Sequence, residues 1–463
     1  MRLAQVAGVV CLLVVALSLP TEMRAQLTFT TNNESISITG YTGNPTVLNI
    51  PGMTNGYPVT SIAANAFLSR LTLASVAIPD SVTNIGAFAF DQCSHMTNFT
   101  FGDGLTTIGL GAFIQCLGLT SITIPNNVTS IGSQAFLNCQ SLTNLTFGGG
   151  VTTIGGLAFG NCYGLTNITI PNSVTGIGTA AFQNCTGLTN IIIGNGVTSI
   201  GQYTLDGCTR LASATIGMPT IRSGLFSSSA SFHGFGNLTS ITMLDSVTNI
   251  ESYAFVDCQS LTNITIPQNV TSIGIGAFSA NALQAITVAP NNTFYSSVDG
   301  ILFDASQSTL IQCPRGLGTS SYTVPNSVTN IGSQAFEFIF GLTKIYFTSN
   351  APSYGASVFS VTFATVYYLP GTTGWGTTYG GLPTAPWLPA MQTNDGSFGV
   401  RTNQFGFNLN WASGQTVVVE ACTGLSHPDW QPVQTNTLTT GSAWFSDPQW
   451  TNYPGRFYRL RSP

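Results

Sequence analysis

Phenylalanine recurs every 23 residues through much of this chain, and this spacing limits the folds available to it more than any other feature. Six consecutive copies are followed, after a break, by two more: Phe67, Phe90, Phe113, Phe136, Phe159 and Phe182, then Phe255 and Phe278. A period this strict indicates one short supersecondary unit stacked many times. Equivalent side chains should then lie over one another from coil to coil.

One good copy shows how a single coil is built. The segment Leu119–Pro125 alternates apolar and polar residues, as a half-buried strand does. Val128–Gly132 forms a second buried edge, and its glycine supplies a bend. Phe136 and Cys139 are three residues apart, which fits a turn of α- or 3₁₀-helix. Because one coil cannot bury its own apolar edge, the sequence predicts a solenoid with a continuous parallel sheet along one side.

Alternate coils differ at the residue that follows the first strand. Proline stands there in one set and glycine in the other: Pro79, Pro125 and Pro171 against Gly102, Gly148 and Gly194. This gives a double period of 46 residues. Duplication of a two-coil unit explains it, and we assign it no functional meaning.

These residues resemble the BspA-type leucine-rich repeat family, whose copies read L-T-x-I-x-I-P-x-x-V-T-x-I-G-x-x-A-F-x-x-C. The resemblance covers residues 28–387 and extends to the Tyr295–Phe303 segment, which is similar to an insert found in the family. It implies an exported protein of bacterial or protozoal type. Some members of the family are adhesins that bind host or partner proteins.

The composition favours export and disfavours nucleic acid as a partner. Only 6% of residues are charged, and the net charge is −5. Residues 1–25 read as a signal peptide, with Arg2, the apolar run Val6–Leu17 and a cleavage point at Ala25. The mature chain would carry a net charge of −6, without the basic surface that nucleic acids require. No second hydrophobic segment predicts a transmembrane helix, so we expect an extracellular or cell-surface location.

The cysteines follow the repeat. Six share one position, and a seventh, Cys258, occupies the same position later: Cys93, Cys116, Cys139, Cys162, Cys185 and Cys208. Stacked coils lie about 4.8 Å apart, which a disulfide can span. The position nevertheless resembles that of a small buried hydrophobe, so buried thiols are favoured and one or two disulfides remain the alternative. Paired C-x-x-C motifs with convergent histidines are absent from the sequence, so no metal site or cofactor is expected.

Two interruptions of the repeat are the first candidates for recognition. The insertion at 227–237 carries Phe232, His233 and Phe235. The insertion at 294–312 contains Tyr295 and reads as a hairpin that projects from its coil, turning at Asp299-Gly300. Residues 26–58 are expected to form a β cap on the first coil, ahead of the solenoid at 59–387.

The residues after 387 lack the repeat and predict a separate domain. All six tryptophans follow residue 370, and short strand-like runs fill 388–463. A small antiparallel β-sandwich is expected, with most of its tryptophans in the core. Exposed tryptophans would instead offer a platform for sugar rings. Arg456, Arg459 and Arg461 are expected to contact a surface partner or to pair with the acidic solenoid.

The leading functional hypothesis is a non-enzymatic binding or adhesion protein that presents the repeats to a macromolecular partner, with a protein as the favoured class of partner. No Ser, His or Asp arrangement predicts catalysis. The candidate partner-binding residues are Phe232, His233, Phe235, Tyr295, Thr123, Thr146 and Thr169. The alternative is a carbohydrate-binding surface protein that uses its C-terminal tryptophans. Ice or mineral binding is disfavoured because Asn and Ile interrupt the threonine ranks.

Overall fold

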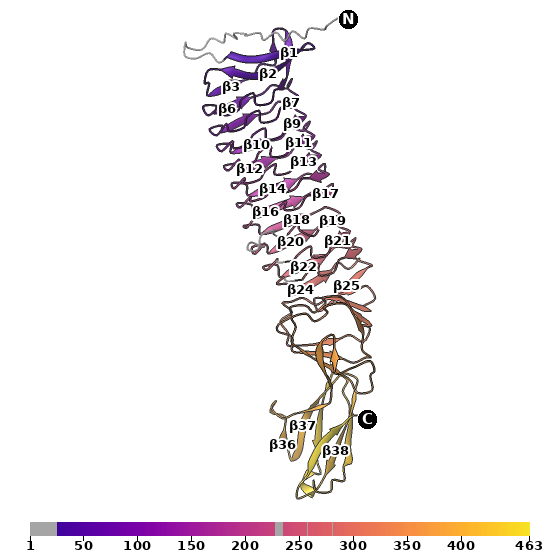
Figure 1. Cartoon of the computed structure of the whole chain (residues 1–463). Coiled ribbons are helices and arrows are strands. Elements are labelled where there is room, and N and C mark those ends of the chain that lie inside the picture. Colours follow the sequence, from indigo (N-terminus) through magenta and orange to yellow (C-terminus); the bar gives the residue numbers. More distant parts are fainter. Residues whose placement is uncertain (1–25, 227–234, 257, 280) are drawn as a thin grey trace, which may run out of the picture. The chain divides into compact units, whose positions relative to one another are not determined.

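The computed structural model describes residues 26–226, 235–256, 258–279 and 281–463. The predicted signal peptide and the insertion residues 227–234, which include Phe232 and His233, lie outside the described residues. The chain divides into two compact units. The first comprises residues up to 317 together with 332–338, and the second comprises 318–331 together with 339–463 (Figure 1).

Two ladders of short, parallel, in-register strands run along the first unit, as the repeat predicts (Figure 1). The first ladder follows the Val-x-x-Ile-Gly segments, with strands β5 (Tyr57–Ile62), β7 (Asn84–Ile85), β9 (Thr107–Ile108), β11 (Ser130–Ile131), β13 (Thr153–Ile154), β15 (Gly176–Ile177), β17 (Ser199–Ile200), β19 (Thr220–Ile221), β21 (Asn249–Ile250) and β23 (Ser272–Ile273). The second ladder has strands β3 (Val47–Asn49), β6 (Ser75–Ala77), β8 (Asn98–Thr100), β10 (Ser121–Thr123), β12 (Asn144–Thr146), β14 (Asn167–Ile170), β16 (Asn190–Ile193), β18 (Ser213–Ile216), β20 (Ser240–Met243), β22 (Asn263–Ile266) and β24 (Ala285–Val288). The solenoid class is therefore confirmed.

The first coil carries an antiparallel hairpin of β1 (Gln26–Asn32) and β2 (Ser35–Thr42), and β4 (Met53–Thr54) pairs with β5. Strand β2 continues the first ladder by pairing in parallel with β5. The Tyr41 ring lies 5.5 Å from that of Phe67, and the Arg70 guanidinium donates to the Tyr41 carbonyl at 3.2 Å. This hairpin thus covers the apolar end of the first coil.

The third side of each coil is a row of turns, where the sequence had suggested helix or 3₁₀-helix. We call Gly132–Cys139 and its equivalents the turn row. Gln134 and Asn138 have φ of 58° and 62°, and the Cys139 N–H donates to the Phe136 carbonyl at 3.2 Å. Because these left-handed residues break any helix, the Phe136 N–H instead donates to Ala158 of the next coil, at 2.7 Å. Within the described residues the one helical segment is the 3₁₀ turn η1 (Trp450–Asn452).

The repeated phenylalanines stack inside the first unit in two runs, from Phe67 to Phe182 and from Phe226 to Phe278. Phe136 is fully buried, and its ring lies 5.0 Å from that of Phe113 and 5.2 Å from that of Phe159, nearly parallel to both. Offset-stacked rings add stabilisation beyond the area that they bury. The predicted ladder of inward-facing aromatics is confirmed.

The nine described cysteines are buried free thiols, so no disulfide joins the described coils. Each ladder thiol donates to the carbonyl of the phenylalanine in the preceding coil, as Cys139 does to Phe113 at 3.2 Å. Burial raises the pKa of Cys93 to about 12 and keeps the pKa of Cys162 well above its usual value. The ladder thiols therefore act as small buried donors, and those of Cys93 and Cys162 stay protonated near neutral pH.

The alternation of proline and glycine has a steric cause in the stack. A Cβ at Gly148 would lie 2.4 Å from the carbonyl oxygen of Pro125 in the preceding coil. The next residue, Gly149, donates its N–H to Asn126 Oδ1 at 3.0 Å. The asparagine of the proline coil thus holds the glycine turn against it, and only a residue without a side chain fits at 148.

The insertion at 294–312 is a packed meander and not the projecting hairpin that the sequence predicted. Strands β25 (Tyr295–Val298), β26 (Ile301–Asp304) and β27 (Thr309–Gln312) pair antiparallel, and the first turn does fall at Asp299-Gly300. Ile301, Leu302 and Phe303 are completely buried. Because three consecutive apolar residues need cover on both faces, the segment lies against the solenoid core.

The second unit contains repeat coils and the two antiparallel sheets of the C-terminal region. Its coil strands are β28 (Ser321–Val324), β29 (Asn330–Ile331), β30 (Lys344–Phe347), β31 (Ser353–Tyr354), β32 (Thr365–Tyr368), β33 (Thr378–Tyr379) and β34 (Leu382–Pro386). One sheet has β35 (Ala390–Gln392), β36 (Gly399–Arg401), β37 (Gln404–Asn410) and β40 (Ser442–Asp447), and the other has β38 (Thr416–Cys422), β39 (Gln431–Thr437) and β41 (Phe457–Arg461). Phe407, Val419 and Phe445 belong to one buried core, which both sheets line as in a β-sandwich.

Candidate binding surfaces

The outward side of β8, β10, β12 and β14, which we call the strand face, carries hydroxyl and amide side chains at equivalent positions of successive coils. Thr123 stands opposite Thr146, and Ser121 opposite Asn144, across the β10–β12 pair. Thr123, Thr146 and Thr169 are all exposed. The structure therefore places these three predicted residues at equivalent positions of successive coils, although it does not test their role.

A hollow of about 400 Å³ interrupts the strand face between β12 and β14, which belong to different sheets. Thr146, Asn167 and Thr169 line it, with the half-buried Leu145 and Phe147 below. None of its lining residues is charged. A concave, uncharged spot with hydroxyl and amide groups suits a neutral polar partner.

The threonines at the edge of the first ladder are held in place by the stack itself. Thr152 Oγ1 donates to the carbonyl of Thr129 at 2.9 Å, and Thr129 Oγ1 donates to that of Thr106 at 3.4 Å. Each hydroxyl thus spans two coils. These side chains lose little further freedom when something binds beside them.

Sequence reasoning missed a series of exposed apolar side chains four residues after the stacked phenylalanines. Leu71, Leu117 and Tyr163 recur every 46 residues in the first unit and are 53%, 38% and 42% exposed. We call these three residues the edge series. The signal was present in the double period, because alternate coils carry an apolar residue at this position. Tyrosine is among the residues that serve as anchors in protein interfaces, and the two leucines add exposed apolar area.

Of the aromatic anchors predicted from the interruptions, one is buried and one is half-buried in the described residues. Phe235 is buried, and its ring packs edge-on against Phe226 at 5.5 Å, which corrects the prediction of an exposed anchor. Tyr295 is half-buried against the solenoid core, and its hydroxyl donates to the Thr271 carbonyl at 3.4 Å. Phe232 and His233 lie outside the described residues. The remaining exposed aromatic of the 294–312 segment is Phe294.

No catalytic arrangement emerges around the described histidines. His95 Nδ1 lies 2.5 Å from the main-chain carbonyl of Leu71, and His427 is exposed. Among residues 26–463, apart from the short gaps given above, no three His, Cys, Asp or Glu side chains are grouped to hold a metal ion. Within the same part of the chain, no helix has the length and apolar character to cross a membrane.

The C-terminal arginines pair within the C-terminal region and not with the acidic solenoid, which corrects one of the two predictions for them. Arg459 and Arg461 each donate Nε to Glu420, at 2.7 and 2.8 Å. Hydrogen bonds from Arg461 and Arg459 lower the pKa of the Glu420 carboxyl. Arg456 lies 3.1 Å from Asp447. The arginines therefore stabilise the fold of this region.

The tryptophans after residue 400 divide differently from the prediction, because only Trp411 is buried. Its Nε1 donates to the Trp387 carbonyl at 2.7 Å. Trp430 is half-buried under the Arg459 guanidinium, 4.6 Å from its ring centre. Trp444 is 42% exposed and lies across Gly406, where a Cβ would come within 2.4 Å of the ring. Trp444 thus presents an open aromatic face.

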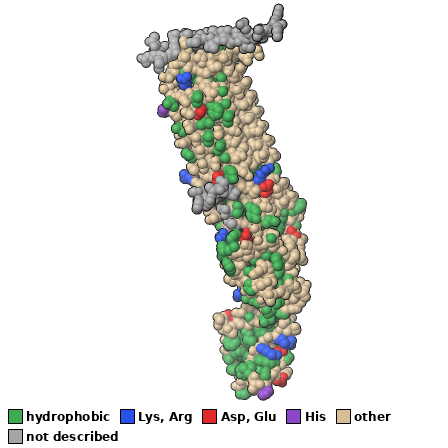
Figure 2. Space-filling model, in the orientation of Figure 1, with side chains coloured by type: hydrophobic (Ala, Val, Ile, Leu, Met, Phe, Trp, Pro, Cys, Tyr) green, Lys and Arg blue, Asp and Glu red, His purple; other side chains and the backbone are tan. Residues whose placement is uncertain are grey.

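A family model for the BspA type leucine-rich repeat region matches residues 60–188, 106–233 and 227–362. These matches span most of the chain, and the protein belongs to this family. The repeats, turn rows and stacked phenylalanines described above are the structural counterpart of that match. The face shown in Figure 2 carries few charged side chains.

Solved structures of leucine-rich repeat proteins are similar to this chain. A leucine rich cell surface protein of Faecalibacterium prausnitzii is 28% identical, over 72% of each chain, with a TM-score of 0.31. A leucine-rich repeat protein of Bacteroides ovatus is 24% identical over 69% of this chain and 92% of its own, with a TM-score of 0.31. A leucine rich repeat protein of T. pallidum is 25% identical over 51% and 87%, with a TM-score of 0.29. No curated protein matches the chain.

Proposed function

We propose that this protein is an exported, non-catalytic binding protein whose strand face contacts a protein partner outside the cytoplasm. The observation that carries the proposal is the exposed, uncharged row of Thr, Ser and Asn side chains on β8, β10, β12 and β14, which is in register across the β10–β12 pair. Such a rank offers donors and acceptors at a regular spacing along a rigid surface. A similar protein is described as a leucine rich cell surface protein, which is consistent with this location.

Affinity needs apolar anchors in addition to polar complementarity. The edge series supplies them in the same unit, with Leu117 and Tyr163 in coils that also contribute to the strand face. A protein partner can satisfy the hydroxyl and amide groups while it covers these side chains. Nucleic acid is a poor fit, because residues 26–387 carry eleven acidic and five basic residues.

The test is capture of envelope proteins by cross-linking to the mature chain. Thr146→Arg combined with Thr169→Arg places two long charged side chains in the hollow of the strand face. The matched control is Thr323→Arg, an exposed threonine at the same repeat position in β28. We expect one protein to be captured by the wild type and by the control and lost with the double variant. Capture that is absent for the wild type, or unchanged by the double variant, would contradict the proposal.

A second candidate function, binding of a glycan, is favoured by Trp444 alone. Its ring lies close to Gly406, with Asn408 opposite Trp444 in register and Asn408 Nδ2 donating to Asp395 at 2.9 Å. An open indole face beside amide and carboxylate groups suits the apolar face and hydroxyl groups of a sugar ring. A glycan array with the full chain and with Trp444→Ala separates this candidate from the first. Protein binding through the strand face predicts no sugar signal that Trp444 controls.

A further inference from the structure

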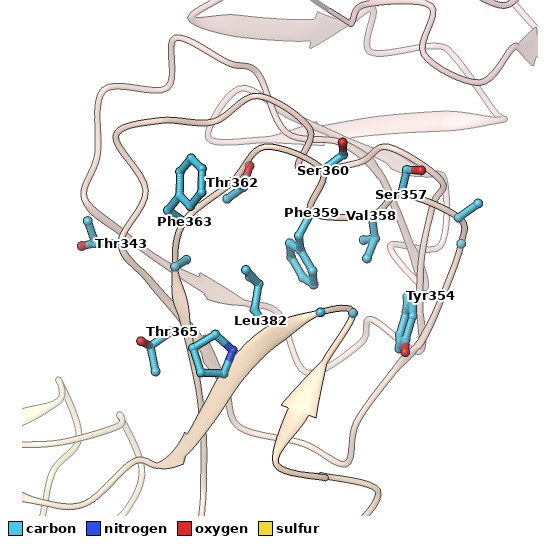
Figure 3. Close-up of a pocket in the computed structure, with 16 residues that line it drawn as sticks. Thr343, Tyr354, Ser357, Val358, Phe359, Ser360, Thr362, Phe363, Thr365 and Leu382 are labelled. Carbon is cyan, nitrogen blue, oxygen red and sulfur yellow. The ribbon is translucent and has the colours of Figure 1, made fainter.

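A pocket of about 900 Å³ lies beside the last turn row of the second unit, Gly355–Thr362. Val358, Phe359 and Leu382 surround the open space, with Phe363 at one end and Tyr354 at the other (Figure 3). None of its lining residues is charged. Phe363 is 74% exposed, which is unusual for so large an apolar side chain.

The pocket exists because the chain begins another turn row at Gly380 and does not complete it. Gly380 stands 23 residues after Ser357 and has φ of 57°, the left-handed value that the third turn-row residue, such as Gln134, takes elsewhere. Gly381 then has φ of 92°, and the chain reverses into the β33–β34 hairpin. The rest of the row that would follow Gly355–Thr362 is therefore missing, and the pocket occupies its place.

In interior coils, main-chain N–H groups of one turn row donate hydrogen bonds to the next row. The N–H groups of Gln134 and Asn138 donate to Gly156 and Gly160 of the following coil, at 2.8 and 2.9 Å. Ser357 and Val361 are the equivalent residues of the last row, with φ of 54° and 55°. In the described residues of the second unit, their N–H groups donate to no main-chain carbonyl. Two backbone donors with the geometry of an interior row therefore face the vacant place.

We propose that this pocket binds an extended, uncharged segment of a protein partner, which adds one turn row to the end of the stack. Its carbonyls accept from Ser357 and Val361, as strands do when a peptide extends a sheet. A single apolar side chain of the segment covers Phe363 and the edge of Leu382. A charged residue is excluded because the pocket offers nothing to pair with it. The inference rests on the proposed function, since it names a segment of that protein partner.

The probe is a synthetic peptide with the sequence of residues 178–184, Gly-Thr-Ala-Ala-Phe-Gln-Asn. In the intact stack this segment accepts from Leu157 and Asn161 through the carbonyls of Thr179 and Gln183, at 3.0 and 2.8 Å. The carbonyl of Gln183 would meet Val361 in the pocket. We expect saturable binding to the full chain by fluorescence anisotropy. A peptide with an ester after Gln183 has a weaker acceptor there and should bind at least about threefold less well.

Two protein variants test the place of binding. Ser360→Trp fills the pocket at a position that carries Leu137 in an interior coil, so a large residue is compatible with the row. Phe363→Ala removes an exposed side chain on which folding does not depend. Each substitution should weaken binding of the peptide by at least about fivefold. The matched control, Phe294→Ala, removes another exposed aromatic and should change nothing.

The outcomes separate this inference from the proposed function. Peptide binding that is lost with both pocket variants and kept with the control supports the pocket. No binding to the wild type, or binding that both pocket variants leave unchanged, overturns the inference. The protein captured in the cross-linking experiment then still decides the proposed function by its dependence on Thr146 and Thr169.

Discussion

The solenoid and the C-terminal region solve the same problem of stability in different ways. In the solenoid each coil repeats its neighbour, and stability comes from identical contacts such as the Phe113–Phe136–Phe159 stack. In the residues after 388 no contact recurs, and single pairs such as Glu420 with Arg459 join particular strands. Residues 388–463 hold four acidic and four basic residues, whereas 26–387 hold eleven and five. The repeated contacts therefore stabilise the solenoid with few charged residues, whereas the non-repeating C-terminal region uses ion pairs.

The largest expected difference concerns thiol reactivity. The nine described cysteines are buried out of reach of a reagent, and burial also raises the pKa of Cys93, Cys116, Cys162 and Cys185, which leaves little thiolate at these four near neutral pH. In the folded protein without reductant we expect almost no reaction with a thiol reagent, and in denaturant we expect nine reactive thiols. Cys422 should become reactive when the C-terminal region unfolds and the ladder thiols when the solenoid does. Fewer than nine thiols in denaturant would reveal disulfides and contradict the structure.

Removal of one stacked ring tests the contribution of the repeat. Phe136→Ala leaves a cavity between two parallel rings and should lower the free energy of unfolding of the solenoid by about 3–5 kcal/mol. Urea denaturation followed by the ladder thiols measures it. Phe294→Ala, at an exposed aromatic, is the control and should cost under about 0.5 kcal/mol. A small effect at Phe136 would mean that coils rearrange independently of their neighbours.

Two adjacent glycines test the steric origin of the double period. Gly148→Ala drives a Cβ onto the Pro125 carbonyl and should destabilise the solenoid by about 1–3 kcal/mol. At Gly149 the nearest atom to a Cβ, Asn126 Oδ1, is 4.0 Å away, so Gly149→Ala is a matched control. Urea denaturation of both variants measures the difference. Equal effects at the two positions would remove the steric explanation.

The dependence of stability on pH should distinguish the two regions. Arg461 and Arg459 lower the pKa of Glu420 in the folded state, so its ion pairs stabilise the C-terminal region above the ordinary glutamate pKa. That contribution disappears as the pH falls through the lowered value. At pH 7 the Glu420→Gln variant should therefore unfold at a lower denaturant concentration than the wild type. In strong acid the two proteins should unfold at the same denaturant concentration. The reactivity of Cys422 reports this region, and a constant difference at all pH values would contradict the assignment.

The smallest expected effect is that of a single threonine hydroxyl. Thr152→Val keeps the shape of the side chain and removes the hydrogen bond to Thr129. Because the hydroxyl is exposed, water replaces the bond, and we expect a loss of about 0.5 kcal/mol or less. Thr123→Val, at a threonine on the strand face, is the control. Differential unfolding in urea measures both.

Much of the fold could be predicted from the sequence, whereas little of the candidate sites could. The 23-residue repeat predicted the strands, the buried Phe136 and the buried Cys139, because each residue packs beside the equivalent residue of the next coil. Phe235 and the 294–312 segment were predicted to protrude, yet Phe235 is buried and the segment packs through its buried residues Ile301, Leu302 and Phe303. Their surroundings come from residues outside the repeat, and no local pattern shows which apolar surface will cover them.

Sequence by itself determined the period, the register of the ladders and the inward direction of the stacked rings, since these follow from one unit meeting its copies. Tertiary structure alone decided the left-handed turn rows, the partners of Arg459 and Arg461, and the place where the last row breaks off at Gly380-Gly381. Those features depend on contacts between segments that are unlike each other. The strength of those contacts depends on how close the segments come in space, which their spacing along the chain does not show.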